Sequence, residues 1–221
     1  MSTGDSKSTR TRSLTWISIA LVAMVAGLLL AKYVIPTSRP LPVLSGGTFL
    51  PEAKNLSPFQ LIDYDGKPFG PKQLQGKWSF VFFGYTNCPD VCPATLYQFK
   101  LIADSLGKDQ HLGDSTRFIF ISVDPDRDTP EHLKKYVQYY NPHFLGLTGA
   151  DSVLRSLGRE MGIIYLRMPN NDNAEDYLID HSSAILLTNP AGQLAAFFSA
   201  PHNANTIVAD YKAIRNYVEG N

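Results

Sequence analysis

The stretch WSFVFFGYTNCPDVCP, residues 78–93, joins an apolar segment to both cysteines of the chain, Cys88 and Cys92. Residues 78–86 are almost all apolar or aromatic, which is typical of a strand buried on both faces of a sheet. Proline is favoured in the first turn of a helix and disrupts a helix interior. We therefore predict that a helix begins at Pro93, with Cys92 near its N-cap and Cys88 in the preceding loop.

Segments with strand and helix patterns alternate around this stretch. Residues 59–69 predict a hairpin with Asp65-Gly66 at its turn. We predict helices over 94–107, 129–141, 151–162 and 205–220, and strands over 116–124, 144–149, 162–168, 183–189 and 193–199. Thr129 and Asp151 are the expected N-caps of the second and third helices. The order indicates one α/β domain with a central mixed sheet and flanking helices, and a cysteine pair between strand and helix makes its plan thioredoxin-like.

The N-terminal region predicts a membrane anchor. Residues 14–31, LTWISIALVAMVAGLLLA, contain no charged side chain. About 20 apolar residues suffice for a helix to cross a bilayer, so we predict one transmembrane helix over residues 14–35. Residues 1–13 carry three basic side chains against one acidic one, which predicts that they stay cytoplasmic and that the rest is exported. A cleaved signal peptide is the alternative, but its apolar region is usually only about 7–15 residues long.

Composition sets the remaining boundaries and excludes two classes of protein. Residues 36–55 are rich in proline and contain Gly46-Gly47, which predicts a semi-rigid linker before a folded domain over residues 56–221. The formal net charge is zero and no run of lysine or arginine resembles a nucleic-acid patch, so nucleic acid is excluded as a partner. Two cysteines are too few to hold 221 residues together as a disulfide scaffold.

The spacing of the cysteines leaves a structural disulfide, a redox-active pair and a metal site open. A disulfide across so short a loop would remove little chain entropy. Redox catalysts of the thioredoxin type use C-x-x-C, whereas this chain has C-x-x-x-C, whose extra residue lets both sulfurs converge on one ion. A helix N-terminus favours the thiolate, the form that attacks disulfides and also binds metal. Soft thiolates select Cu(I) or Zn, and an imidazole would complete a trigonal copper site.

His181 is the preferred third ligand among the five histidines. It lies in a short polar break before the predicted strand 183–189, and the loop before that strand in a thioredoxin-like sheet faces the start of the cysteine-bearing helix. Asp124 falls at the C-terminal end of a predicted strand, the edge where α/β sheets place their sites, and either supports a metal ligand or caps a turn. Asp180 either orients His181 or caps its loop.

Three motifs follow one another along the chain: GYTNCPDVCP (84–93), SVDPDRDTP (122–130) and DYLIDHSSAILL (176–187). Together they resemble the SCO/SenC family of membrane-anchored copper chaperones, over about residues 55–219 plus the anchor. The resemblance implies a thioredoxin-like fold. It also implies a site of Cys88, Cys92 and His181 that binds Cu(I) and Cu(II).

The resemblance further implies a chaperone rather than an enzyme, which delivers copper to the CuA centre during the assembly of cytochrome c oxidase. The implied partners are the oxidase subunit that carries the CuA site, a thiol reductant of the thioredoxin type and another copper donor. The alternative is a thiol–disulfide oxidoreductase, with a redox-active disulfide of Cys88 and Cys92, that reduces the oxidase subunit or other exported proteins. We expect the bacterial inner membrane with the domain in the periplasm. The alternative location is the mitochondrial inner membrane, facing the intermembrane space.

Overall fold

The computed structural model describes residues 16–27, 29–30, 40–168 and 177–220. The chain divides into two compact units, Met1–Pro40 and Leu41–Asn221. In the first unit, residues 16–27 are helical. Among the described residues, no helix combines the length and the apolar character needed to cross a membrane. The predicted anchor over residues 14–35 lies partly outside the described residues and stays a prediction.

The second unit is built on a mixed sheet of eight strands in the order β1-β10-β9-β4-β5-β6-β2-β3. These strands are β1 (Gly47–Lys54), β2 (Leu61–Asp63), β3 (Pro68–Phe69), β4 (Trp78–Gly84), β5 (Thr116–Ser122), β6 (Leu145–Thr148), β9 (Ile185–Thr188) and β10 (Leu194–Phe198). Strand β4 pairs parallel with β5 and antiparallel with β9, and every residue of β4 is buried. A separate hairpin pairs β7 (Tyr165–Met168) with β8 (Leu178–His181). The predicted mixed sheet with a buried central strand is confirmed.

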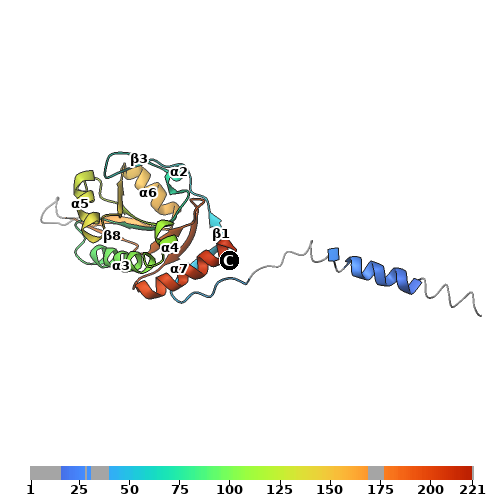
Figure 1. The fold of residues 1–221 in the computed structure, drawn as a ribbon. Helices are drawn as coiled ribbons and strands as arrows, with labels where there is room; N and C mark the ends of the chain where they lie inside the picture. The colour runs from blue at the N-terminus through green and yellow to red at the C-terminus, as the bar shows by residue number, and fades with distance from the viewer. Residues whose placement is uncertain (1–15, 28, 31–39, 169–176, 221) are drawn as a thin grey trace, which may run out of the picture. The chain divides into compact units, whose positions relative to one another are not determined.

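Helices cover both faces of the sheet. They are α2 (Pro71–Leu74), α3 (Val91–Leu106), α4 (Gln110–Asp114), α5 (Pro130–Tyr140), α6 (Asp151–Glu160) and α7 (Ala204–Glu219). Figure 1 shows α3 and α7 on one side of the sheet and α6 on the other. Successive side chains of a strand point to opposite faces of the sheet. Phe80 and Phe118 contact Phe99 of α3 on one face, whereas Val81 lines a small apolar space with Leu157 of α6 on the other.

The cysteine-bearing helix begins earlier than predicted. Helix α3 starts at Val91, with Asp90 at its N-cap, so Cys92 lies inside the first turn. The prediction of a start at Pro93 was wrong because the first N–H groups of a helix have no acceptor within it. A proline without an N–H is therefore tolerated at several positions of the first turn.

The predicted caps of the next two helices differ in outcome. Thr129 caps α5 as predicted, and its side chain accepts the backbone N–H of His132 at 3.3 Å. At α6 the N-cap is Ala150, not Asp151. The Asp151 carboxylate instead pairs with Arg155, 2.7 Å away along the same helix.

The second half of the predicted linker belongs to the folded domain. Gly47–Lys54 form the edge strand β1, which pairs antiparallel with β10, where the composition of residues 36–55 predicted a tether. The Asp210 carboxylate of α7 accepts the backbone N–H groups of Ser45, Gly46 and Gly47 at 2.9, 2.8 and 2.8 Å. This contact fixes the start of the strand through a residue far away in sequence, which local composition does not reveal.

Glu219 at the end of α7 gives the domain a pH-dependent contact. Its carboxylate accepts hydrogen bonds from Trp78 Nε1 and from Arg215 Nε, each at 3.0 Å. Burial alone would raise the pKa of Glu219, but these hydrogen bonds and the charge of Arg215 outweigh it and hold the pKa below its ordinary value. Because the folded pKa is the lower one, the stabilisation is complete above the unfolded pKa and is lost as the pH falls through the folded pKa.

We expect Glu219→Gln to lower the free energy of unfolding by about 1 kcal/mol near neutral pH and by clearly less at about pH 3. Urea unfolding at both pH values measures the change. Glu52→Gln, which alters an exposed side chain of β1, is the control and should cost less than about 0.5 kcal/mol. Equal losses for Glu219→Gln at both pH values would contradict the assignment.

Candidate metal centre

The two cysteines lie where the central strand passes into helix α3. Strand β4 ends at Gly84, and the backbone N–H of Cys88 donates to the carbonyl oxygen of Tyr85 at 3.3 Å in the following turn. Cys92 is fully buried in the first turn of α3, whereas Cys88 is half-buried in the loop before it. The pair therefore lies at the carboxyl end of β4, the edge where open α/β sheets bind ligands.

Gly84 makes room for the buried sulfur. A Cβ atom at this position would lie 2.8 Å from Cys92 Sγ and 2.8 Å from the ring of Phe120. Such distances are too short for real Cβ atoms, so the residue that separates strand from thiol has to be small. The sulfur of Cys92 consequently rests on the backbone of β4, beside Phe120.

The surroundings of Cys92 favour its protonated form. A hydrogen bond with the Cys88 thiol, followed by burial, raises the pKa of Cys92 far above its ordinary value. The sequence predicted thiolate stabilisation by the helix N-terminus, but that partial charge is outweighed by burial and by the neighbouring sulfur. The same hydrogen bond shows that the two sulfurs are adjacent. A soft cation that bound both would displace protons from the pair.

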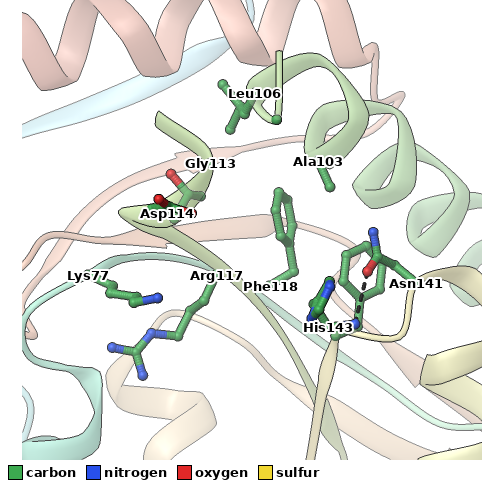
Figure 2. A pocket seen from close by; sticks show the side chains of 12 residues that line it. Lys77, Ala103, Leu106, Gly113, Asp114, Arg117, Phe118, Asn141 and His143 are labelled. Carbon is green, nitrogen blue, oxygen red and sulfur yellow. Dashed lines mark hydrogen bonds between the residues drawn. The ribbon is translucent and has the colours of Figure 1, made fainter. Parts of the chain in front are cut away.

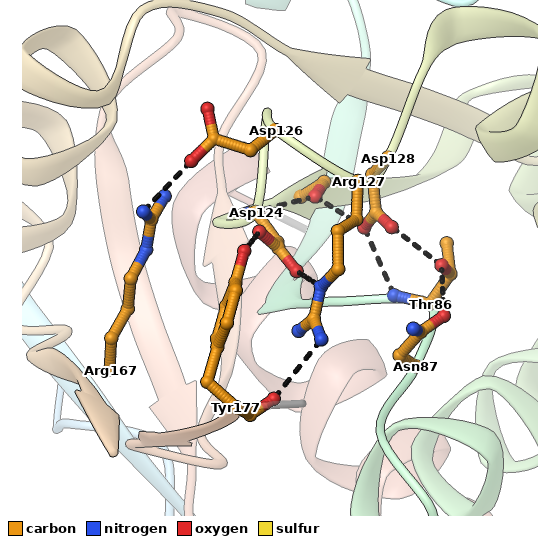
Figure 3. Close-up of polar contacts among 9 residues, drawn as sticks. Thr86, Asn87, Asp124, Asp126, Arg127, Asp128, Arg167 and Tyr177 are labelled. Atoms are coloured by element: carbon orange, nitrogen blue, oxygen red, sulfur yellow. Dashed lines mark hydrogen bonds and ion pairs between the residues drawn. The ribbon is translucent and has the colours of Figure 1, made fainter. Parts of the chain in front are cut away.

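A buried aspartate holds the loop in front of Cys88. Asp128 is 1% exposed and accepts hydrogen bonds from the Thr86 backbone N–H at 3.0 Å, the Thr86 hydroxyl at 2.5 Å and the Ser122 hydroxyl at 2.5 Å (Figure 3). Burial raises the pKa of Asp128 in spite of these hydrogen bonds. The carboxylate thus ties the cysteine loop, residues 85–90 between β4 and α3, to the end of β5.

Residues 124–128, the loop that follows β5, also hold the segment that leads to His181. Asp124 is fully buried, pairs with Arg127 and accepts a hydrogen bond from the Tyr177 hydroxyl (Figure 3). Arg127 also donates to the Tyr177 carbonyl oxygen at 3.1 Å, and its guanidinium carbon lies 3.7 Å from the centre of the Tyr177 ring. Residues 124–128 therefore contact both the cysteine loop and the approach to β8. The predicted support of a metal ligand by Asp124 stays a prediction.

The strand of His181 packs against the cysteine loop. His181 is the last residue of β8, and its backbone pairs with Tyr165 of β7. A backbone hydrogen bond joins Ile179, on the same strand, to the side chain of Tyr85 in the cysteine loop. The sequence predicted a polar break where the structure has β8, and the role of His181 as the third ligand stays a prediction.

The complete ligand set lies partly outside what the structure describes, because the side chain of His181 is not described. Within the described side chains, no group of three or more His, Cys, Asp or Glu is arranged to hold a metal ion. Asp180 is exposed on β8, opposite Leu166 of β7. Its predicted role in orienting His181 stays a prediction.

Two supports of this region were not predicted. The link between Thr86 and Asp128 joins residues 42 positions apart, which no local pattern reveals. His202, expected at the surface or as a cap, is half-buried, and its Nε2 lies 2.7 Å from the carbonyl oxygen of Ser183, just after β8. The side chain that caps α7 is that of Asn203. The contact of Thr86 with Asp128 holds the segment just before Cys88, and the contact of His202 with Ser183 holds the segment just after His181.

Known proteins resemble this chain over most of the folded domain. The model of the SCO1/SenC family matches residues 50–216. The Arabidopsis thaliana protein SCO1 homolog 1, mitochondrial, is 35% identical over 161 residues, which are 72% of this chain and 47% of that protein. This chain thus spans about half the length of that relative.

Solved structures of Sco proteins also resemble this chain. The crystal structure of Arabidopsis thaliana ScoI with copper bound is 34% identical, has a TM-score of 0.67, and is matched over 73% of this chain and 98% of that one. BsSco, a member of the Sco family of cytochrome c oxidase assembly proteins in which a disulfide switch has been identified, is 26% identical with a TM-score of 0.59. That match covers 74% of this chain and 95% of BsSco.

Proposed function

Since the chain belongs to the SCO1/SenC family, we propose that it is a copper-binding chaperone in the assembly of cytochrome c oxidase. Copper is its cargo, held by the thiolates of Cys88 and Cys92 and the imidazole of His181. One observation carries the proposal: the Cys88 thiol, in the loop before helix α3, is hydrogen-bonded to the Cys92 thiol in its first turn, and the strand of His181 is joined to the same loop. The copper in Arabidopsis ScoI supports the identity of the ion. Two thiolates and an imidazole also match the ligands that Cu(I) prefers.

The unequal burial of the two cysteines sets the order in which the copper ligands are exchanged during transfer. Cys92 is enclosed between α3 and β4, whereas Cys88 lies in a loop and is half-buried. An incoming thiolate or imidazole of an acceptor therefore reaches copper on the Cys88 side. Ligand exchange begins there, and the bond to Cys92 is the last to be replaced.

The acceptor in this proposal is the oxidase subunit that carries the CuA site. A thiol reductant of the thioredoxin type keeps the cysteines reduced, because thiols exposed to an oxidising compartment form disulfides. Another protein, a copper donor, loads the site. We place the domain in the periplasm, tethered to the bacterial inner membrane by residues 14–35, with the mitochondrial intermembrane space as the alternative.

A thiol–disulfide oxidoreductase is the second candidate function. The contact between the Cys88 and Cys92 thiols favours it, because adjacent sulfurs are what disulfide formation requires. The disulfide switch of BsSco supports the same chemistry in a relative. In this alternative the pair transfers two electrons and two protons to a disulfide of the oxidase subunit and becomes a disulfide itself.

Copper transfer without oxygen separates the two functions. The reduced full chain, loaded with one equivalent of Cu(I), is mixed with the separate CuA-carrying domain of an oxidase subunit whose cysteines are already reduced. We expect copper to move to the acceptor and the absorption of the assembled CuA centre to develop once Cu(II) is also supplied. If copper stays behind while the chain readily reduces an oxidised acceptor, the oxidoreductase is the better assignment.

Gly84 provides a test of the sulfur position. We expect Gly84→Ala to weaken Cu(I) binding by about tenfold or more, because the added methyl group pushes Cys92 Sγ away from the strand. Competition with a Cu(I) chelator measures the affinity. Gly146→Ala on β6 is the matched control, since its Cβ would lie 2.6 Å from the Leu133 side chain and crowds the core elsewhere. Both variants should lose stability, and equal copper affinity in both would contradict the argument.

A further inference from the structure

A cleft of about 480 Å³, whose lining residues are drawn in Figure 2, lies at the edge of the sheet opposite the one that the cysteines follow. Lys77 directly precedes β4 and Thr116 begins β5, so the cleft lies where these two strands start. The cysteines follow the far end of β4, which at about 3.3 Å per residue is roughly 20 Å away. The volume is that of a small-molecule site, and the position separates it from the candidate metal centre.

The floor of the cleft is apolar and partly aromatic. The rings of Phe118 and Phe144 lie 5.1 Å apart between centroids and are 7% and 2% exposed. Ala103 and Leu106 of α3 line the same space. Figure 2 shows the Phe118 ring between these helix residues and the polar side chains of the rim. Ring faces and alkyl groups at this spacing suit a flat, apolar molecule.

The rim carries cations that have no carboxylate partner. Lys77, Arg117 and His143 line the cleft, and Asp114 is the acidic side chain among the lining residues. Within the described part of the chain, neither Lys77 nor Arg117 takes part in an ion pair. The cations therefore outnumber the anions at this rim even when His143 is neutral.

Among these groups, Arg117 is a partly buried cation whose hydrogen bonds are incomplete. Its terminal nitrogens donate only to the backbone carbonyls at the end of α2, and its buried Nε has no hydrogen-bond partner among the described residues. Burial lowers the pKa of Arg117, which reflects the cost of a cation held without a counter-charge. An anion in the cleft would reduce that cost.

We propose that this cleft binds a small organic anion with a flat apolar body, of the class of aromatic carboxylates. The ring system lies on Phe118 and Phe144, and the carboxylate is attracted by Lys77 and Arg117. A neutral molecule of the same shape gains only the apolar contacts. Anion binding here does not depend on the proposed function, because the residues that line the cleft include neither cysteine, no residue between β4 and α3 and no residue of β8.

The test uses the purified full chain and 6-fluoro-2-naphthoate, with binding followed by ¹⁹F NMR line broadening. We expect saturable binding at one site per chain. Lys77→Glu should weaken it by about tenfold or more, because one attractive charge becomes repulsive, and 6-fluoro-2-naphthamide should bind correspondingly more weakly than the naphthoate. Lys108→Glu, an exposed lysine outside the lining, is the matched control and should stay within about twofold.

A second variant blocks the space itself. Ala103→Trp places an indole in the cleft and should abolish saturable binding, while urea unfolding confirms that the variant is folded. Binding that is absent in the parent, or that survives both Lys77→Glu and Ala103→Trp unchanged, would overturn the proposal. Copper titration of the same samples should be unaffected by either substitution, so failure here is distinguishable from failure at the cysteines.

Discussion

Replacing Cys88 and Cys92 together by serine is expected to abolish tight Cu(I) binding, with a loss of affinity well beyond the roughly 100-fold that changes around a metal site produce. Serine keeps the size of cysteine but offers a hard, neutral oxygen that Cu(I) does not select. Anaerobic titration against a Cu(I) chelator measures the loss. Copper binding that persists at the parental affinity would remove the cysteines from the site.

The single variants Cys88→Ser and Cys92→Ser should weaken copper binding to a similar degree, but they should differ in stability. Cys92 is fully buried beside Phe120, so a serine hydroxyl there is placed in an apolar space, at a cost of about 1–3 kcal/mol. Cys88 is half-buried in a loop, so Cys88→Ser should change the free energy of unfolding by less than about 1 kcal/mol. Urea unfolding without copper separates this effect from metal binding.

Asp128→Ala is expected to lower the free energy of unfolding by about 2–4 kcal/mol and to weaken copper binding by about 10–100-fold. The substitution removes the acceptor for the Thr86 backbone N–H and for the hydroxyls of Thr86 and Ser122. Because Thr86 lies in the cysteine loop, two residues before Cys88, its release loosens the more exposed sulfur. Chemical unfolding and chelator competition measure the two effects.

Asp126→Ala is the matched control for this prediction. Asp126 belongs to the same loop, but its side chain is 66% exposed and its ion pair is with Arg167 on the surface, at 2.8 Å. Such pairs contribute little, so the loss of stability should stay below about 1 kcal/mol. If Asp126→Ala and Asp128→Ala weaken copper binding to the same degree, the buried hydrogen bonds of Asp128 are not what positions the cysteine loop.

Much of the fold follows from local patterns. The apolar run of β4 and the stripe of α3 predicted their elements because burial on both faces, or on one face, leaves a direct mark on a sequence. Strand β1 was assigned to a linker because its stability comes from Asp210 and from pairing with β10, both distant in sequence. Pro93 misplaced the start of α3 by two residues because a first turn accepts proline at several positions.

The candidate site was predictable to a different extent. Cys88, Cys92 and His181 stand out because thiols and imidazole are rare and chemically specific, and the structure brings their segments together. The supporting contacts do not stand out. Aspartates and threonines are common in loops, so the link of Asp128 to Thr86, or of Asp124 to Tyr177, becomes visible only once the segment after β5 is placed beside the segment after β4 and the one before β8.

X-ray absorption at the copper edge, on the full chain loaded with one equivalent of Cu(I), identifies the atoms that bind the ion. We expect two sulfur ligands and one imidazole nitrogen in the parent. The scattering of the imidazole ring should disappear in His181→Ala, while both sulfurs remain. An unchanged imidazole signal in His181→Ala, or a parent spectrum with fewer than two sulfurs, would contradict the site of Cys88, Cys92 and His181.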